Sequence, residues 1–140
     1  MTDDVILNKV ATIERCVQRA REEYEAEPET FATNFTRQDA AILNIQRACE
    51  AALDIGHYLI RRDKLGIPQG ARDVFSLLER AQWIDSGMSE SLKRMVGFRN
   101  IAVHDYRALQ LPIVTTIIEK HLDDFLAFGR VMLKNAPSRD

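Results

Sequence analysis

Three polar side chains whose types can do chemistry stand close together in the sequence: Arg99, His104 and Tyr106. An arginine is permanently charged and can bind a phosphodiester through two parallel hydrogen bonds. A histidine titrates near neutral pH and can therefore move a proton at a ribose hydroxyl. An arginine and a histidine are together the minimal set for cleaving RNA without a metal.

The same spacing also has a purely structural interpretation. Arg99 can interact with the last carbonyl groups of a helix, His104 can cap its end, and Tyr106 can pack as an amphipathic side chain. On a regular helix Arg99 and His104 point about 140° apart, because successive residues are rotated by about 100°. They converge only if the helix ends between them or if two chains contribute. We expect the helix to end near Asn100.

Signatures of other catalytic classes are absent from the sequence. It contains no Gly-rich phosphate loop, no His-Glu-x-x-His and no Gly-x-Ser-x-Gly pattern. The three histidines are widely separated, and Cys16 and Cys49 do not flank them at ligand spacing. We therefore expect no metal and no cofactor, and we expect both cysteines to be reduced thiols in the core.

Length and charge narrow the possible functions. The chain has 140 residues and a formal net charge of -2, so we expect one domain over 1–140 and no global basic field. Residues 1–30 carry four basic and eight acidic side chains, whereas 61–107 carry nine basic and six acidic, a net of +3. Any contact with a polyanion should therefore be local and should use the second half of the chain.

The sequence shows no signal for a membrane or for export. The first residues, Met-Thr-Asp-Asp, lack the basic and apolar regions of a signal peptide. No apolar run approaches the roughly 18 residues of a membrane span. We expect a cytoplasmic protein without membrane contact.

The apolar residues recur with a helical period along almost the whole chain, which predicts an all-α fold. Five helices are expected. They run from Asp3 and Asp4 to Pro28, from Thr36 to Arg62, from Arg72 to Ile84, from Ser89 to Asn100, and onward from Leu111 with Pro112 in the first turn. The predicted core stripes are Ile6, Val10, Ile13, Val17, Ala20 and Tyr24; Ala41, Ile45, Ala48, Ala52, Ile55 and Leu59; Leu92, Met95, Val96 and Phe98; Val114, Ile118, His121, Phe125 and Met132.

These helices should pack as an up-and-down bundle, because short connections make neighbours antiparallel. Thr36 and Asp39 form a capping-box-like pair at the start of the second helix. The Gly- and Pro-containing stretch 63–70 reads as a connector between helices, and 136–140 as a loose tail. Long helices in so small a domain leave part of their apolar surface uncovered, which favours a homodimer.

The residues around the motif resemble the HEPN family, specifically the HepT toxin branch of the HepT/MntA toxin–antitoxin modules. The pattern Arg-x4-His-x-Tyr is complete here, within Met-Val-Gly-Phe-Arg-Asn-Ile-Ala-Val-His-Asp-Tyr. Upstream, the phrase Leu53-Asp-Ile-Gly-His-Tyr-Leu-Ile60 is similar to an Asp-x-x-His element of such proteins. The all-helical layout agrees with the family across nearly the whole chain.

The resemblance implies a metal-independent endoribonuclease that acts as a homodimer, with two motifs facing each other across a cleft. Arg99 would hold and neutralise the scissile phosphate, His104 would act as general base or general acid, and Asn100 would orient the phosphate or the imidazole. The products would be a 2',3'-cyclic phosphate and a 5'-hydroxyl. Asp54 and His57 would support the motif, with Asp54 orienting Arg99, or would form a polar pair at a helix interface.

The resemblance gives Tyr106 a separate role. In the HepT branch a partner antitoxin, the MntA-like minimal nucleotidyltransferase (MNT), transfers AMP from ATP to the motif tyrosine. Added charge and bulk beside the motif would block the groove for RNA. The chain is thereby expected to be the toxin of a type VII-like module whose partners are RNA, the antitoxin and a second copy of itself.

Two other interpretations stay open at this point. A non-catalytic HEPN module can act as a scaffold, or present a nucleotide to a nucleotidyltransferase. A helical adaptor unrelated to RNA can carry the motif for structural reasons alone. The adaptor should bury Arg99 and His104 in contacts within the chain, whereas a nuclease should expose them in a cleft.

Overall fold

The computed structural model describes residues 3–135, and every regular element in that range is helical. The predicted tail 136–140 lies outside the described residues. The elements are α1 (Asp4–Glu25), η1 (Pro28–Thr33), α2 (Phe35–Asp63), α3 (Ala71–Arg80), α4 (Ser86–His104), η2 (Tyr106–Ala108), α5 (Leu111–Thr116), η3 (Ile117–His121) and α6 (Leu122–Asn135).

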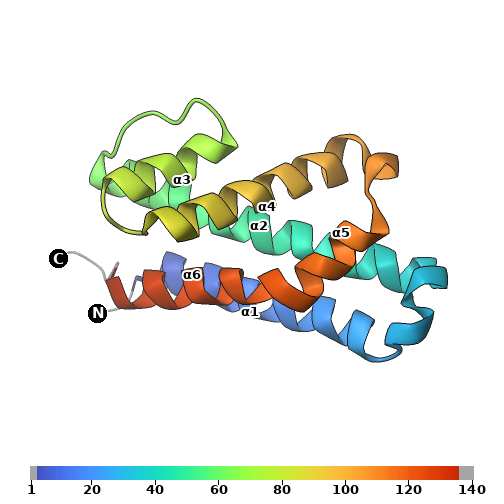
Figure 1. Ribbon diagram of the computed structural model, residues 1–140. Helices are drawn as coiled ribbons and strands as arrows, with labels where there is room; N and C mark the ends of the chain where they lie inside the picture. The colour runs from blue at the N-terminus through green and yellow to red at the C-terminus, as the bar shows by residue number, and fades with distance from the viewer. Residues whose placement is uncertain (1–2, 136–140) are drawn as a thin grey trace.

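The long helices run up and down along one axis (Figure 1). α1 packs most extensively against α2, α6 packs on α1, and α4 packs on α2. The short helix α3 lies at one end, against α2 and α4, and the segment η2–α5 lies at the other end. The predicted all-α, up-and-down bundle is confirmed.

The predicted apolar stripes form the core. Of the residues predicted to face it, all are buried except Tyr24 and His121, which are partly exposed. Tyr24 packs its ring edge-on against Phe31 and places its hydroxyl at the surface, where it donates to Glu119. His121 lies 3.3 Å from Asp124 through its Nδ1. Both residues are amphipathic, which explains their position at the edge of the core.

Side-chain caps start three of the helices. Asp3 begins α1 as predicted, because its carboxylate accepts from the Val5 N–H. The predicted cap of α2 at Thr36 is wrong: Asn34 holds that position and accepts from the Arg37 N–H. The chain leaves η1 at Asn34 with a non-helical backbone, and an asparagine in that conformation is a strong cap. Asp39 is thereby released from the capping role expected for it.

Helix α4 is longer than predicted at both ends. It begins at Ser86, because the Asp85 carboxylate accepts from the Met88 N–H. It also does not end near Asn100 but runs on to His104, where the Asp105 N–H still donates to the Ile101 carbonyl. No glycine or proline lies between Asn100 and His104 to break it. The motif therefore lies on one continuous helix.

Other boundaries differ in smaller ways. α3 ends at Arg80, short of the predicted Ile84, because the chain turns at Gln82 with a φ of 65°. The first helix ends at Glu25, and Pro28 opens η1. The predicted last helix is present with Pro112 in its first turn, but a π-helical turn separates α5 from α6. Within 3–135, no helix has the length and apolar character required to cross a bilayer.

Candidate functional site

The continuity of α4 separates the two charged residues of the motif. With about 100° per residue, Arg99 and His104 point about 140° apart. Arg99 points toward α2, where its guanidinium lies beside Cys49, and His104 is exposed at the last residue of α4. The expected end of the helix between them is absent, so the two side chains do not converge within one protomer.

The Arg99 guanidinium is partly buried, with the Cys49 thiol beside it. Its Nε–H is shielded from solvent and has no hydrogen-bond acceptor. Within residues 3–135, no carboxylate lies within ion-pair distance of it. A guanidinium that is partly removed from water without an acid destabilises the fold, because its lost hydration is not replaced. Its charge is therefore available for an anion that the protomer does not supply.

The thiol beside Arg99 is not reactive at neutral pH. Burial raises the pKa of Cys49 to about 12, and the nearby guanidinium only partly opposes the rise. Burial also raises the pKa of Cys16. Both cysteines are free and buried, as predicted, and a protonated thiol is a poor nucleophile.

Tyr106 lies in η2 and reaches back to the start of α2. Its hydroxyl donates a hydrogen bond to Asp39 Oδ1, while 44% of the residue stays exposed. Loss of hydration and the Asp39 carboxylate raise the pKa of Tyr106 to about 12, so its hydroxyl is protonated at neutral pH. The partner Asp39 was not predictable from the sequence, because no local pattern relates residues that lie 67 positions apart.

Asn100 lines an open hollow of about 530 Å³ between the start of α3 and α4. Arg72 and Lys93 line the same hollow. The motif is therefore continued on one side by two basic side chains that the sequence analysis did not single out.

Asp54 and His57 do not join the motif within one protomer. Asp54 forms an ion pair with Lys9 of α1, with 2.9 Å between Nζ and Oδ2. It follows Cys49 by five residues on α2 and so points about 140° away from the residue that meets Arg99. His57 is partly buried on the same helix. In the described residues, no contact between Asp54 and Arg99 supports the predicted positioning of Arg99 by Asp54.

The polar groups of the motif are a guanidinium, an imidazole, an amide and a phenol. Within residues 3–135, no three His, Cys, Asp or Glu side chains come close enough together to hold a metal ion. Guanidinium and amide groups bind anions, an imidazole transfers protons, and a phenol can be modified at its oxygen. The arrangement is suited to a phosphate-containing substrate.

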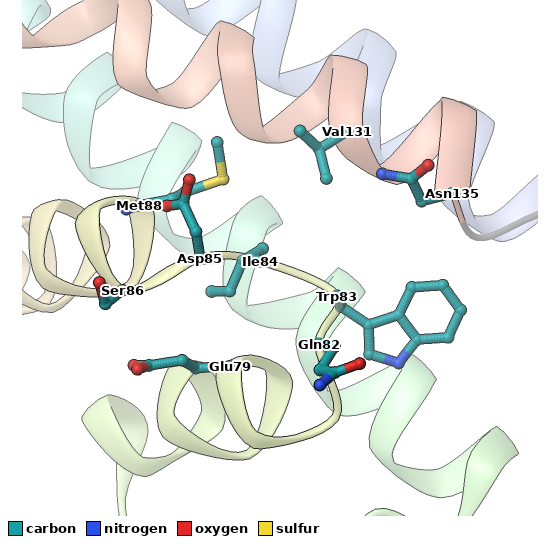
Figure 2. A pocket seen from close by; sticks show the side chains of 9 residues that line it. All are labelled: Glu79, Gln82, Trp83, Ile84, Asp85, Ser86, Met88, Val131 and Asn135. Carbon is teal, nitrogen blue, oxygen red and sulfur yellow. Dashed lines mark hydrogen bonds between the residues drawn. The ribbon is translucent and has the colours of Figure 1, made fainter.

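A second hollow, of about 500 Å³, lies near the start of α4, at the other end of that helix from the motif. Figure 2 shows Glu79 and Asp85 among its lining residues, together with Val131 and Asn135 of α6. The lining includes these two acids and no basic residue. Like charges repel, so this hollow is unsuited to a phosphate.

Comparison with known proteins gives consistent results. The family described as "Ribonuclease HepT-like" matches residues 13–132. The chain is also 48% identical to the mRNA nuclease HepT of Shewanella oneidensis over 126 residues, which are 90% of this chain and 94% of that protein. The matched family range includes all of α4.

Solved structures show the same architecture. A crystal structure of a toxin–antitoxin with AMP-PNP contains a chain with a TM-score of 0.89 and 47% identity, covering 93% of this chain and 98% of that one. The tri-AMPylated HEPN toxin of Shewanella oneidensis, in complex with an MNT antitoxin, has the same TM-score and identity, with coverage of 94% and 98%. The likeness therefore extends over almost the full length of each chain.

Proposed function

The chain belongs to the HepT-like ribonuclease family, and from that premise we propose that it is the toxin of a toxin–antitoxin module. It cleaves RNA as an endoribonuclease, and an MNT-type nucleotidyltransferase antitoxin neutralises it by adding AMP to Tyr106. The relatives support both parts, since one is an mRNA nuclease and another is an AMPylated toxin bound to an MNT antitoxin.

The observation that carries this proposal is the state of Arg99. A partly buried guanidinium with an unpaired Nε–H, and with no carboxylate of residues 3–135 within ion-pair distance, can bind an anion from outside the protomer. A phosphodiester carries the opposite charge, and its two acceptor oxygens match the parallel N–H donors of a guanidinium. Arg99 thus holds the scissile phosphate and neutralises the charge that builds up on its oxygens during cleavage.

His104 supplies the proton transfer. It takes the proton of the ribose 2'-hydroxyl, whose oxygen attacks phosphorus and displaces the 5'-oxygen, or it protonates that leaving oxygen. The products are a 2',3'-cyclic phosphate and a 5'-hydroxyl, and Asn100 orients the phosphate from the same helix. No step requires a metal, so cleavage should persist in excess EDTA.

The site is completed by a second copy of the chain. Since Arg99 and His104 of one protomer point about 140° apart, the guanidinium of one copy and the imidazole of the other act on one phosphate. An apolar hollow of about 480 Å³ between α4 and α5 supports contact between copies at this end. Ile101 and Ile113 line it and are 41% and 50% exposed. Exposed apolar side chains grouped in this way are typical of an interface.

AMP on Tyr106 would stop the reaction by charge and bulk. The modified oxygen belongs to the second residue after His104, so the added phosphate competes with RNA for the same positive charge. The exposed position of Tyr106 in η2 leaves it accessible to an antitoxin.

Mixed dimers test the composite site. Arg99→Ala and His104→Ala chains with different tags are co-expressed, and the mixed dimer is purified through both tags. Each pure variant should be inactive on RNA, whereas the mixed dimer should recover about half the wild-type activity, because one of its two sites keeps both groups. A folded mixed dimer without activity would contradict the composite site.

Expression in cells tests the activity itself. Induction of the wild-type chain should stop growth and degrade cellular RNA, and neither single variant should do so. Co-expression of the antitoxin should restore growth and add AMP to Tyr106. Harmless wild-type expression with intact RNA would instead favour a non-catalytic scaffold, the alternative suggested by the separation of Arg99 and His104 within one protomer.

A further inference from the structure

A row of residues continues from His104 along the side of α4 that faces the start of α3. Lys93, Gly97, Asn100 and His104 follow one another at spacings of four, three and four residues. Such spacing places them within about 60° of one face of the helix. The row is therefore a straight line of positions that begins at the motif histidine and leads toward α3.

Arg72 of α3 fills the one gap in this row. A Cβ built on Gly97 would lie only 2.8 Å from Arg72 Nη2, so the guanidinium occupies the space where a side chain of residue 97 would begin. Gly97 permits this close approach because it has no Cβ. The Arg72 guanidinium thereby lies on α4, one turn from Asn100, as a second cation beside Lys93. Arg72, Lys93 and Asn100 line the same open hollow of about 530 Å³.

The positive charges of this row are weakly paired within the described residues. Within residues 3–135, Arg72 has no carboxylate within ion-pair distance. Lys93 lies 3.9 Å from its nearest acid, Glu90. The one acid that lines the hollow, Asp73, is engaged elsewhere: its Oδ2 accepts from the Gln69 N–H at 2.9 Å, and its Oδ1 lies 3.6 Å from Arg80.

The length of the row matches a nucleic-acid strand better than a small ion. Lys93 and His104 are separated by about 16 Å along α4, at about 1.5 Å per residue. A single phosphate fills only a fraction of that length, whereas a nucleic-acid strand held at His104 would pass its neighbouring phosphates along the row. Side chains spaced in this way contact the backbone and are indifferent to the base sequence.

We propose that this row, which we call the α4 groove (Arg72, Lys93, Gly97, Asn100 and His104), binds the single-stranded RNA that adjoins the cleavage site. Arg72 holds the phosphate next to the scissile one, and Lys93 holds a phosphate further along. Asn100 donates to the backbone between His104 and Arg72. The inference rests on the proposed ribonuclease function and adds substrate contacts that lie outside the Arg-x4-His-x-Tyr motif.

The affinity for RNA and its salt dependence test the groove. The probe is a fluorescein-labelled single-stranded RNA of about 12 nucleotides, 2'-O-methylated so that it cannot be cleaved, and the readout is anisotropy across a salt series. Arg72→Gln and Lys93→Gln should each weaken binding several-fold. Each should also lower the slope of log K against log salt by about 0.7, the loss of one phosphate contact. The control Arg130→Gln removes an exposed arginine on α6 and should change neither quantity.

Gly97→Ala tests the geometry without removing a charge. Its methyl group displaces the Arg72 guanidinium from α4, while alanine favours the helix. The variant should melt at the wild-type temperature or above it and still bind RNA as weakly as Arg72→Gln. The double variant Arg72→Gln/Gly97→Ala should bind RNA no more weakly than either single variant, because both substitutions remove the same contact.

The outcomes separate this inference from the proposed function. Unchanged RNA binding in Arg72→Gln and Lys93→Gln, with a wild-type chain that cleaves unmodified RNA, overturns the groove and leaves the nuclease intact. Weakened binding in both variants, with a wild-type chain that does not cleave, supports the groove and overturns the nuclease. A wild-type chain that neither binds nor cleaves overturns both.

Discussion

Two polar clusters of this bundle differ in whether their charges have partners. Where α1 begins and α2 ends, the Tyr58 hydroxyl donates to Asp3, and Arg62 Nη1 lies 3.5 Å from the same carboxylate. Arg62 also donates from Nε to Asp63 at 2.9 Å. On α4, by contrast, Arg99 has neither an acid within reach nor an acceptor for its Nε–H in the described residues.

The difference separates structural from functional polarity. The first cluster, Asp3, Tyr58, Arg62 and Asp63, is satisfied within the chain and joins the start of α1 to the end of α2. An ion network of this kind fixes the positions of helix ends. The second leaves a charge uncompensated, which a folded chain tolerates where a ligand completes the site. Removing a group from the first should cost stability, and removing one from the second should cost activity.

The largest effect is expected for Arg99→Met. Cleavage of RNA should fall by about 10²–10³-fold, because the charge that stabilises the reacting phosphate is lost. The free energy of unfolding should stay the same or rise, since a partly buried charge without a partner is replaced by an apolar chain of similar length. Turnover on a labelled RNA and a denaturant titration measure the two quantities. A marked loss of stability would show that Arg99 is a structural residue after all.

A smaller effect, on stability alone, is expected for Asp3→Ala. Loss of the α1 cap should lower the free energy of unfolding by about 1 kcal/mol, while RNA cleavage at neutral pH stays unchanged. Glu14→Gln removes an exposed carboxylate from the middle of the same helix and serves as the control. Reduced cleavage by an Asp3→Ala chain that is still fully folded would erase the distinction between the clusters.

The effect of Asp3 should also depend on pH. Burial raises the pKa of this carboxyl, but the Tyr58 hydroxyl, backbone N–H groups of α1 and the Arg62 charge outweigh it and hold the pKa below the ordinary 3.8. A lowered pKa stabilises the folded state above the ordinary value, and that stabilisation disappears as the pH falls through the folded-state pKa. The difference between wild type and Asp3→Ala should therefore be constant near neutral pH and shrink in acid. A difference that grows in acid would contradict this sign.

The smallest effects are expected for a matched pair of tyrosine variants. Both Tyr58 and Tyr106 donate to an aspartate, Asp3 and Asp39 respectively. Tyr58→Phe should lower the free energy of unfolding less than Asp3→Ala does, because water can replace the lost hydrogen bond, and should leave modification by the antitoxin intact. Tyr106→Phe should retain cleavage and lose modification, as measured by intact mass after incubation with ATP and the nucleotidyltransferase. Modification of Tyr106→Phe at wild-type levels would place the AMP elsewhere.

The general features of the fold were predictable because they are encoded locally. A helical period of apolar residues defines which face of each helix is buried, and nearly all predicted stripe residues are buried. The family was predictable from the spacing of Arg99, His104 and Tyr106, and the family match over 13–132 confirms it. Helix ends were less predictable, as at Asn34 and His104, because competing caps and the lack of a breaker decide them.

The sequence by itself determined the helical class, the buried faces and the residue types available for chemistry. Only the tertiary structure decided which polar groups meet: Arg99 beside Cys49, Tyr106 on Asp39, and Arg72 over Gly97. These contacts join helices that are distant in the sequence, and their geometry depends on how the bundle packs. Local periodicity carries no information about such distances, whereas the packing of α2, α3 and α4 sets them all at once.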